Sequence, residues 1–325
     1  MKRSAIWPAW RKILRGQKPM LSVEITRTCP LHCPGCYAYQ PEHLGEVGSL
    51  HQMADLQGEA LVSGILGLVR RHRPLHLSIV GGEPLVRYRE LDVLLPKLDQ
   101  MGVEVQLVTS AVRPVPIAWH SIPSFRLVVS VDGLPADHDV RRAPATYDRI
   151  LKNIAGHRLN VHCTITRPMV GKPAYFSEFA AFWSARPEID RIWFSLYTPQ
   201  QGEQTAERLT PEDRRAVLLE LADLRARFPK VELPDRVLEG FRDAPSSPQE
   251  CIFAQTTSCL SADLKTPISP CQFGGRPVCT ECGCVASAAL ASVGRYKIGG
   301  LVRVSDIFVW SQRIGRLAGN VYESS

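Results

Sequence analysis

The sequence predicts an α/β protein in which strands alternate with helices around a parallel sheet or barrel. Between residues 21 and 200, β-branched apolar runs alternate with segments whose apolar residues recur at helical spacing. This alternation is typical of parallel sheets, because consecutive parallel strands need a crossover connection. The pattern does not distinguish an open sheet from a closed barrel. In either case the chemistry is expected at the carboxyl ends of the strands.

Six strands and several helices are expected in this part of the chain. The expected strands are 21–26, 75–80, 103–109, 125–131, 161–166 and 192–196, and the expected helices are 53–72, 90–101, 147–155 and 175–185. The proline-rich segment 110–121 fits neither pattern.

Beyond residue 200 the pattern changes, which indicates a boundary. A helix should start at Thr210, because Thr is a good N-cap, Pro follows at the first helical position and Asp213 stands at the third. Prolines then mark a linker, and from Cys251 the chain is rich in cysteine. We divide the chain into a basic N-terminal segment (1–20), an α/β domain (21–200), a helix and linker (201–250) and a small C-terminal cysteine-rich module (251–325).

Composition indicates a soluble cytoplasmic protein. The 325 residues are 45% hydrophobic and 22% charged, with no apolar run long enough to span a membrane and no signal peptide at the start. Ten cysteines in a cytoplasmic chain predict metal ligands rather than disulfides. They form two groups, 29–36 and 251–284, separated by Cys163 alone, so two metal centres are the simplest interpretation.

The net charge of +7 is concentrated at the N-terminus. Residues 1–18 read as a basic amphipathic helix with two tryptophans, which either contacts a membrane surface or lies on the main domain with its charges in solvent. No nucleic-acid-binding module is recognised, so no nucleic-acid partner is expected. The basic residues of this segment are Lys2, Arg3, Arg11, Lys12, Arg15 and Lys18.

Three cysteines follow the first expected strand at the spacing C-x3-C-x2-C: Cys29, Cys33 and Cys36. Thiolates are the usual ligands of Fe–S clusters, one for each iron. Three thiolates on a [4Fe–4S] cluster leave the fourth iron open for a substrate or cofactor, as in catalytic metal sites. A zinc knuckle, or three unrelated buried thiols, is the structural alternative.

This loop resembles the signature of radical S-adenosylmethionine (SAM) enzymes. Gly81-Gly82-Glu83-Pro84, after the second expected strand, resembles the motif that binds the amino group of SAM in that family. The resemblance implies a partial (β/α)6 barrel, a [4Fe–4S] cluster, SAM as cofactor and an electron donor such as a flavodoxin or ferredoxin. The cluster would reductively cleave SAM to a 5′-deoxyadenosyl radical, which abstracts hydrogen from an unknown substrate.

A third region resembles peptide-modifying and sulfatase-maturing members of the family. It runs from Ser130 and Asp132 through the pair Arg141-Arg142. The resemblance implies contacts from Ser130 and one of the two arginines to SAM, and an Arg fork suits a carboxylate. The alternative for the arginine pair is a solvated turn. Thr109 and Ser110 are weaker candidates for the same cavity.

The C-terminal cysteines resemble the auxiliary-cluster modules of some radical SAM enzymes, of SPASM or twitch type. They bracket an expected hairpin of 257–264 and 268–273. We expect one auxiliary [4Fe–4S] cluster, with a zinc ribbon as the alternative; the first ligand set is Cys251, Cys259 and Cys271 plus one of the last three. The six candidates are Cys251, Cys259, Cys271, Cys279, Cys282 and Cys284.

The sequence therefore predicts a radical SAM enzyme of the oxidoreductase or maturase type, with an unknown substrate. One rival is an enzyme of this kind that acts on a lipid or isoprenoid at a membrane surface. A second rival is a non-enzymatic Fe–S or zinc protein that transfers electrons. Cys163 is a catalytic candidate as a thiol facing the cavity, with core packing as its alternative.

Overall fold

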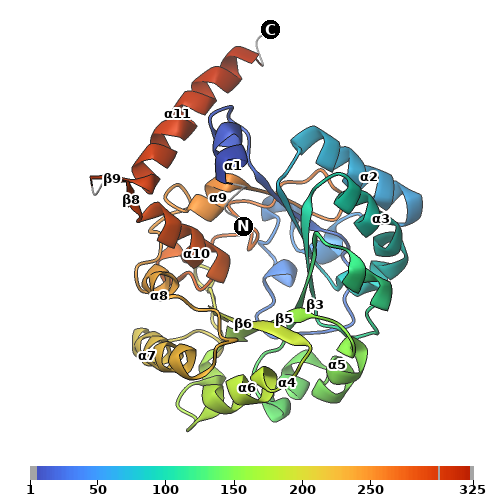
Figure 1. The fold of residues 1–325 in the computed structure, drawn as a ribbon, viewed down its shortest axis with the longest axis vertical. Helices are drawn as coiled ribbons and strands as arrows, with labels where there is room; N and C mark the ends of the chain where they lie inside the picture. The colour runs from blue at the N-terminus through green and yellow to red at the C-terminus, as the bar shows by residue number, and fades with distance from the viewer. Residues whose placement is uncertain (1–5, 299–300, 323–325) are drawn as a thin grey trace.

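The computed structural model describes residues 6–298 and 301–322, and its centre is a parallel sheet of seven strands. The strands are ordered β6-β5-β4-β3-β2-β1-β7, and every neighbouring pair is parallel (Figure 1). Because β6 and β7 are its edges, the curved sheet is an unclosed barrel. The bounds are β1 Met20–Glu24, β2 His76–Val80, β3 Glu104–Thr109, β4 Phe125–Ser130, β5 Leu159–Ile165, β6 Ile189–Leu196 and β7 Thr257–Leu260.

The six expected strands are confirmed, with ends that differ by a few residues. The seventh strand differs from expectation, because the expected hairpin of 257–264 and 268–273 forms only in part, where Ser261 N donates to Thr266 O and Ile268 N donates to Cys259 O, both at 2.9 Å. Strand β7 ends at Leu260 and pairs in parallel with β1, and a single antiparallel bridge between Leu260 and Pro267 is what forms of the hairpin. Strand β7 therefore pairs with β1 along one edge and contacts residues 266–268 along the other, so the two pairings coexist.

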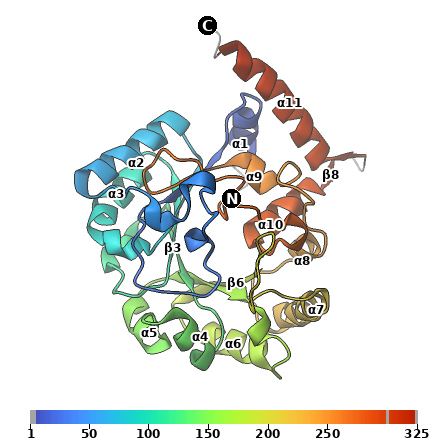
Figure 2. The same cartoon turned by 180° about the vertical axis from the view of Figure 1, so that it is seen from behind.

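Helices cover the outer face of the sheet and its open side. Figures 1 and 2 show α2 to α6 around the outside of the strands, and α7, α8 and α10 beside the edge strand β6. The Thr210 cap is confirmed: its side chain accepts from Asp213 N, and Asp213 accepts from Thr210 N. The bounds are α2 Gly58–His72, α3 Tyr88–Gln100, α4 Pro135–Arg142, α5 Tyr147–Ile154, α6 Tyr175–Ser184, α7 Pro211–Arg227, α8 Asp235–Arg242, α9 Ile252–Thr256 and α10 Val285–Gly294.

Short 3-10 helices and a small second sheet complete the described structure. The sheet pairs β8 (Lys297–Ile298) with β9 (Val302–Arg303). The proline-rich segment forms a 3-10 helix at its end, and the helix expected from residue 53 begins at Gly58. The 3-10 helices are Tyr37–Tyr39, Gly45–Val47, Leu50–Gln52, Pro84–Arg87, Ile117–Ser121, Arg167–Met169 and Cys279–Glu281.

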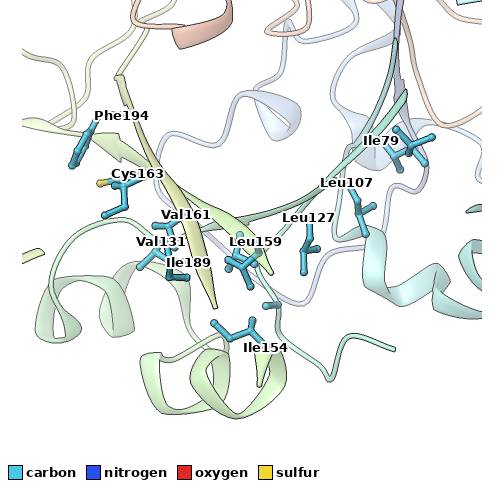
Figure 3. Packing of buried hydrophobic residues seen from close by; sticks show 14 of the residues in the cluster. Ile79, Leu107, Leu127, Val131, Ile154, Leu159, Val161, Cys163, Ile189 and Phe194 are labelled. Carbon is cyan, nitrogen blue, oxygen red and sulfur yellow. The ribbon is translucent and has the colours of Figure 1, made fainter. Parts of the chain in front are cut away.

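The hydrophobic core lies between the sheet and the outer helices. Figure 3 shows Leu127 and Leu159 pointing from their strands toward Ile154 of α5. Cys163 belongs to this core, with 0% exposure, and it does not line the cavity described below. Core packing, the second of its two interpretations, therefore describes Cys163.

The first and last described helices pack against each other at the edge of the molecule. Figure 2 shows α1 (Ile6–Ile13) beside α11 (Val304–Tyr322). The ring centroids of Trp10 in α1 and Phe308 in α11 lie 6.5 Å apart. Trp7 is 76% exposed, whereas Ala9 and Ile13 are buried. Lys2 and Arg3 of the basic segment lie outside the described residues. Among the described helices, none has the length and apolar character to cross a membrane.

Candidate active site

The curved sheet encloses a cavity of about 1270 Å³ that extends to the carboxyl ends of its strands. Most residues that the motifs singled out meet in its wall, although they come from distant parts of the chain. Pro84 is buried beside the cavity without lining it. The candidates in the wall are Cys29, Cys33, Cys36, Gly81, Gly82, Glu83, Ser130, Asp132, Arg141, Arg142 and Cys284.

The cysteine loop follows β1 and turns sharply before its last cysteine. Gly35 adopts a φ of +65°, and a Cβ there would lie 2.7 Å from the Tyr197 hydroxyl, so the close approach requires glycine. Cys36 N donates to Cys33 O at 3.3 Å. The turn brings the three thiols to one end of the cavity.

The chemistry of the three thiols fits a cluster. Burial, with a smaller contribution from the charge of Cys33, raises the pKa of Cys29 to about 12 and that of Cys36 to about 11. Neighbouring thiols of this kind are stabilised as thiolates by a soft cation. Among the described residues, no three His, Cys, Asp or Glu side chains meet at a point that would hold one metal ion. A cluster makes no such demand, because each thiolate binds a separate iron.

The Gly81-Gly82-Glu83 turn packs directly against the chain that leads into the cysteine loop. Gly81 has a φ of +79°, and a Cβ there would lie 2.2 Å from Cβ of Glu24. Gly82 has a φ of +53° and would meet Thr28 O at 2.5 Å, and Glu83 N donates to the same carbonyl at 2.9 Å. Two glycines are therefore needed for the two motifs to adjoin.

The Glu83 carboxylate is buried, and donors of the chain already occupy it. Its Oε1 accepts from Leu85 N at 2.9 Å and from the Thr109 hydroxyl. Its Oε2 accepts from Ser110 N at 2.8 Å and from the Ser110 hydroxyl. Four donors fill the acceptor sites of a carboxylate. A ligand amino group would therefore have to displace one of the two hydroxyl donors.

Arg141 and Arg142 hold a buried carboxylate at the cavity wall. Asp132 Oδ2 accepts from Arg141 Nε at 3.1 Å and from Arg142 Nε at 2.7 Å, and Arg141 also pairs with Glu207. Burial alone would raise the pKa of Asp132, but the two guanidinium groups outweigh it and hold this pKa well below its ordinary value. The arginines are thus fixed side chains rather than part of a solvated turn.

Changing Asp132 to Asn should destabilise the protein by about 2–3 kcal/mol at pH 7, because both arginines lose a charged partner. The folded pKa of Asp132 lies below its unfolded value of about 3.9. The stabilisation is therefore complete above about pH 4 and is lost as the pH falls through the folded pKa. Urea unfolding of the metal-free protein should show the largest difference from wild type at pH 7 and a smaller one below pH 4. An equal difference at both pH values would contradict this.

The remaining cavity candidates have simpler surroundings. Ser130 ends β4 and is 8% exposed. His138, in the same region, accepts from Asp132 N through Nδ1 at 3.0 Å, and its Nε2 lies 2.8 Å from Ala145 O. Burial lowers the pKa of His138 to about 4, in agreement with a neutral ring that donates through Nε2. This histidine fixes the turn and does not face the cavity.

The structure gathers several C-terminal cysteines beside the end of β6. Burial raises the pKa of Cys282 and of Cys284, and the charge of Cys251 raises both further. Burial also raises the pKa of Cys279, with further contributions from the charges of Cys282 and Cys251. Gly283, between two of these cysteines, donates to the Thr198 hydroxyl at 2.8 Å and has no room for a side chain, because a Cβ would lie 1.9 Å from Leu196 O.

Cys259 and Cys271 stand differently in this arrangement. Cys259 lies on β7 and packs in one hydrophobic cluster with Ala38 and Ile268, to which Cys36 also contributes. Cys271 packs against the cluster of Cys251. The expected ligand set grouped Cys259 with Cys251 and Cys271. In the structure Cys259 instead packs beside the first cysteine loop, whereas Cys271 packs with Cys251.

One buried network was missed in the sequence. Glu24 at the end of β1 contacts His43 Nε2 at 2.8 Å and accepts from the Ser261 hydroxyl at 2.8 Å, with 1% exposure. An acidic residue inside an apolar strand was the available signal, since buried carboxylates are rare unless they are paired.

Comparison with known proteins supports the resemblance found in the sequence. No protein-family model matches the chain. A 7-carboxy-7-deazaguanine synthase from Hyperthermus butylicus is 33% identical over 110 residues, which are 33% of this chain and 41% of that protein. The match therefore spans less than half of that relative.

Two solved structures share the fold over most of the chain. SuiB from Streptococcus suis, bound to the precursor peptide SuiA, matches with a TM-score of 0.60 and 15% identity over 94% of this chain and 68% of that one. The enzyme anSMEcpe with bound AdoMet matches with a TM-score of 0.53 and 17% identity over 78% of this chain and 74% of that one.

These proteins are radical SAM enzymes. The chain thus has the unclosed α/β barrel fold of that superfamily. Together the fold and the partial sequence match support the radical SAM superfamily for this protein.

Proposed function

We propose that the protein is a radical SAM enzyme in which Cys29, Cys33 and Cys36 hold a [4Fe–4S] cluster. The observation that carries this proposal is the meeting of three thiols with the Gly81-Gly82-Glu83 turn at one end of a large cavity. When reduced, such a cluster supplies the electron that cleaves SAM into methionine and a 5′-deoxyadenosyl radical, which then abstracts hydrogen from the substrate.

The chain's own residues position SAM and line the cavity. The glycine turn lets the ligand approach the backbone closely, and Glu83 is fixed in place by Thr109 and Ser110. Arg141 and Arg142 present fixed cations to the carboxylate of SAM. The sheet and apolar side chains of α10 line the cavity in which the radical would meet its substrate.

The reaction type is a hydrogen abstraction that leads to oxidation, cross-linking or maturation of a substrate. SuiB was solved with a precursor peptide, and a peptide is accordingly one substrate class for this chain. The electron donor would be a flavodoxin or ferredoxin.

The test is anaerobic reconstitution with iron and sulfide, followed by incubation with SAM and dithionite. The proposal expects release of 5′-deoxyadenosine, whereas an electron-transfer or zinc protein releases none. Chromatographic quantitation of 5′-deoxyadenosine therefore decides between the proposal and its non-enzymatic rival.

We also propose an auxiliary cluster held by four of Cys251, Cys271, Cys279, Cys282 and Cys284. Changing Cys251 and Cys282 together to Ala should lower the iron content by about four atoms per chain. The matched control is Cys259→Ala, which should keep its iron because Cys259 packs with Ala38 and Ile268, in a different cluster from that of Cys251. An iron count that is unchanged in the double variant would remove the auxiliary cluster, and zinc in place of iron would favour a zinc ribbon.

A further inference from the structure

Polar side chains form a row across the wall of the cavity. Ser22 on β1, Ser78 on β2 and Gln106 on β3 are register partners of one another. Register partners of a parallel sheet point to the same face, while their neighbours along each strand point to the other face. The neighbours Leu77 and Leu107 accordingly lie in the hydrophobic core and not in the cavity wall, whereas the row lines the cavity.

Asn160 of β5 extends this polar surface across the cavity. Asn160 is 8% exposed and lines the same cavity, and Ser22 is 2% exposed. We call Ser22, Ser78, Gln106 and Asn160 the polar floor. All four side chains are uncharged.

The hydrogen-bonding groups of the polar floor are unused by the protein. No described residue hydrogen bonds to any of these four side chains. Polar groups inside proteins are nearly always paired, and leaving one unpaired costs about 1–3 kcal/mol. Such groups converging on a cavity therefore indicate a ligand, or the water that a ligand displaces.

The polar floor lies below the motifs that would bind SAM. Ser78 lies two residues, or about 7 Å, before the end of β2 at Val80, and the Gly81-Gly82 turn follows. Val80 and Val108 line the wall between them, and so does His162, whose Nε2 lies 2.8 Å from the Ser195 hydroxyl. An elongated substrate can therefore reach the polar floor with one end while its reacting carbon stays at the cysteine loop.

Arg126 of β4, the register partner of Gln106, also lines the cavity, and β4 separates the row from Asn160. We propose that the four uncharged side chains of the polar floor bind a neutral end of the substrate that carries hydroxyl groups or an amide. Hydroxyl and carboxamide side chains both donate and accept hydrogen bonds, so they satisfy a ligand group that does the same. An apolar chain would leave these groups unpaired, which argues against a lipid tail at this place. An anion would instead seek Arg126, the exposed register partner of Gln106. The inference rests on the proposed function for the position of the reacting carbon.

Saturation-transfer NMR with small probes tests the polar floor without any catalysis. The probes are D-glucose, acetamide, acetate and hexanol, each added to the reconstituted protein without reductant. We expect saturable binding of glucose or acetamide, weakened at least tenfold by Ser78→Val with Gln106→Leu. The matched control, Ser63→Ala with Gln100→Leu, alters exposed residues of α2 and α3 and should bind like wild type.

Binding that is equal in the variant and the control, or confined to acetate or hexanol, would overturn the proposal. If the Val/Leu variant does not fold, the smaller Ser78→Ala with Gln106→Ala takes its place. Because no reductant is present, probe binding is independent of SAM cleavage. Probe binding without 5′-deoxyadenosine release in the separate assay would overturn the proposed function alone, and the reverse result would overturn the polar floor alone.

Discussion

Replacing Cys29, Cys33 and Cys36 together with Ala should reduce 5′-deoxyadenosine release to background and remove about four irons per chain. The three thiols line the same end of the cavity. Without them an iron cluster has no ligands there, and SAM has no source of the electron. Activity should fall by several orders of magnitude, since cleavage requires the cluster rather than being assisted by it. Iron and sulfide quantitation beside product chromatography measures both effects.

Cys163→Ala is the matched control for this experiment. Cys163 is as buried as a core residue can be and lies away from the cavity, so its loss should leave the iron content and product release near wild type. A triple variant that still released 5′-deoxyadenosine would refute the assignment of the cluster to this loop. A Cys163→Ala protein that lost its iron would show that the assay responds to misfolding, and the triple variant would then need comparison at matched stability.

Local features were predictable from the sequence because they depend on residues that are adjacent in the chain. The cysteine loop, the glycine turn and the Thr210 cap each depend on a few adjacent side chains. The place of β7 is different, because its partner β1 stands more than 200 residues earlier in the chain. The local pattern predicts the hairpin contact, which forms in part, but it contains no signal for the pairing of the other edge of β7 with β1.

The ion pairs and hydrogen bonds between candidate residues could not be predicted from the sequence. The sequence placed Asp132 and the arginine pair in one region, but not the ion pairs that join them. Likewise Glu83 was expected to face a ligand, whereas its oxygens accept from Thr109 and Ser110 of the next strand. Such contacts cross between strands, and their distances depend on the register of the whole sheet.

The second large effect is expected at the buried pair Glu24 and His43. His43→Ala should lower the free energy of unfolding by about 3–5 kcal/mol, because it leaves a carboxylate buried without its main partner. Both side chains are 1% exposed, and the contact is 2.8 Å. His43 Nδ1 also lies 3.0 Å from Phe273 O, so the ring joins the region of the first cysteine loop to the segment after Cys271. Denaturant unfolding of the metal-free protein measures the loss.

The surface pair of Arg158 and Asp190 supplies the control, because Arg158 is 68% exposed and Asp190 is 32% exposed. Asp190→Asn should cost about 1 kcal/mol or less. Glu24→Leu and His43→Leu, made singly and together, form a double-mutant cycle in which the double change should cost less than the sum of the two single changes by about 0.5–3 kcal/mol. If His43→Ala cost no more than Asp190→Asn, the pair would not be the link between the two cysteine regions. Strict additivity would mean that Glu24 is held by Ser261 rather than by His43.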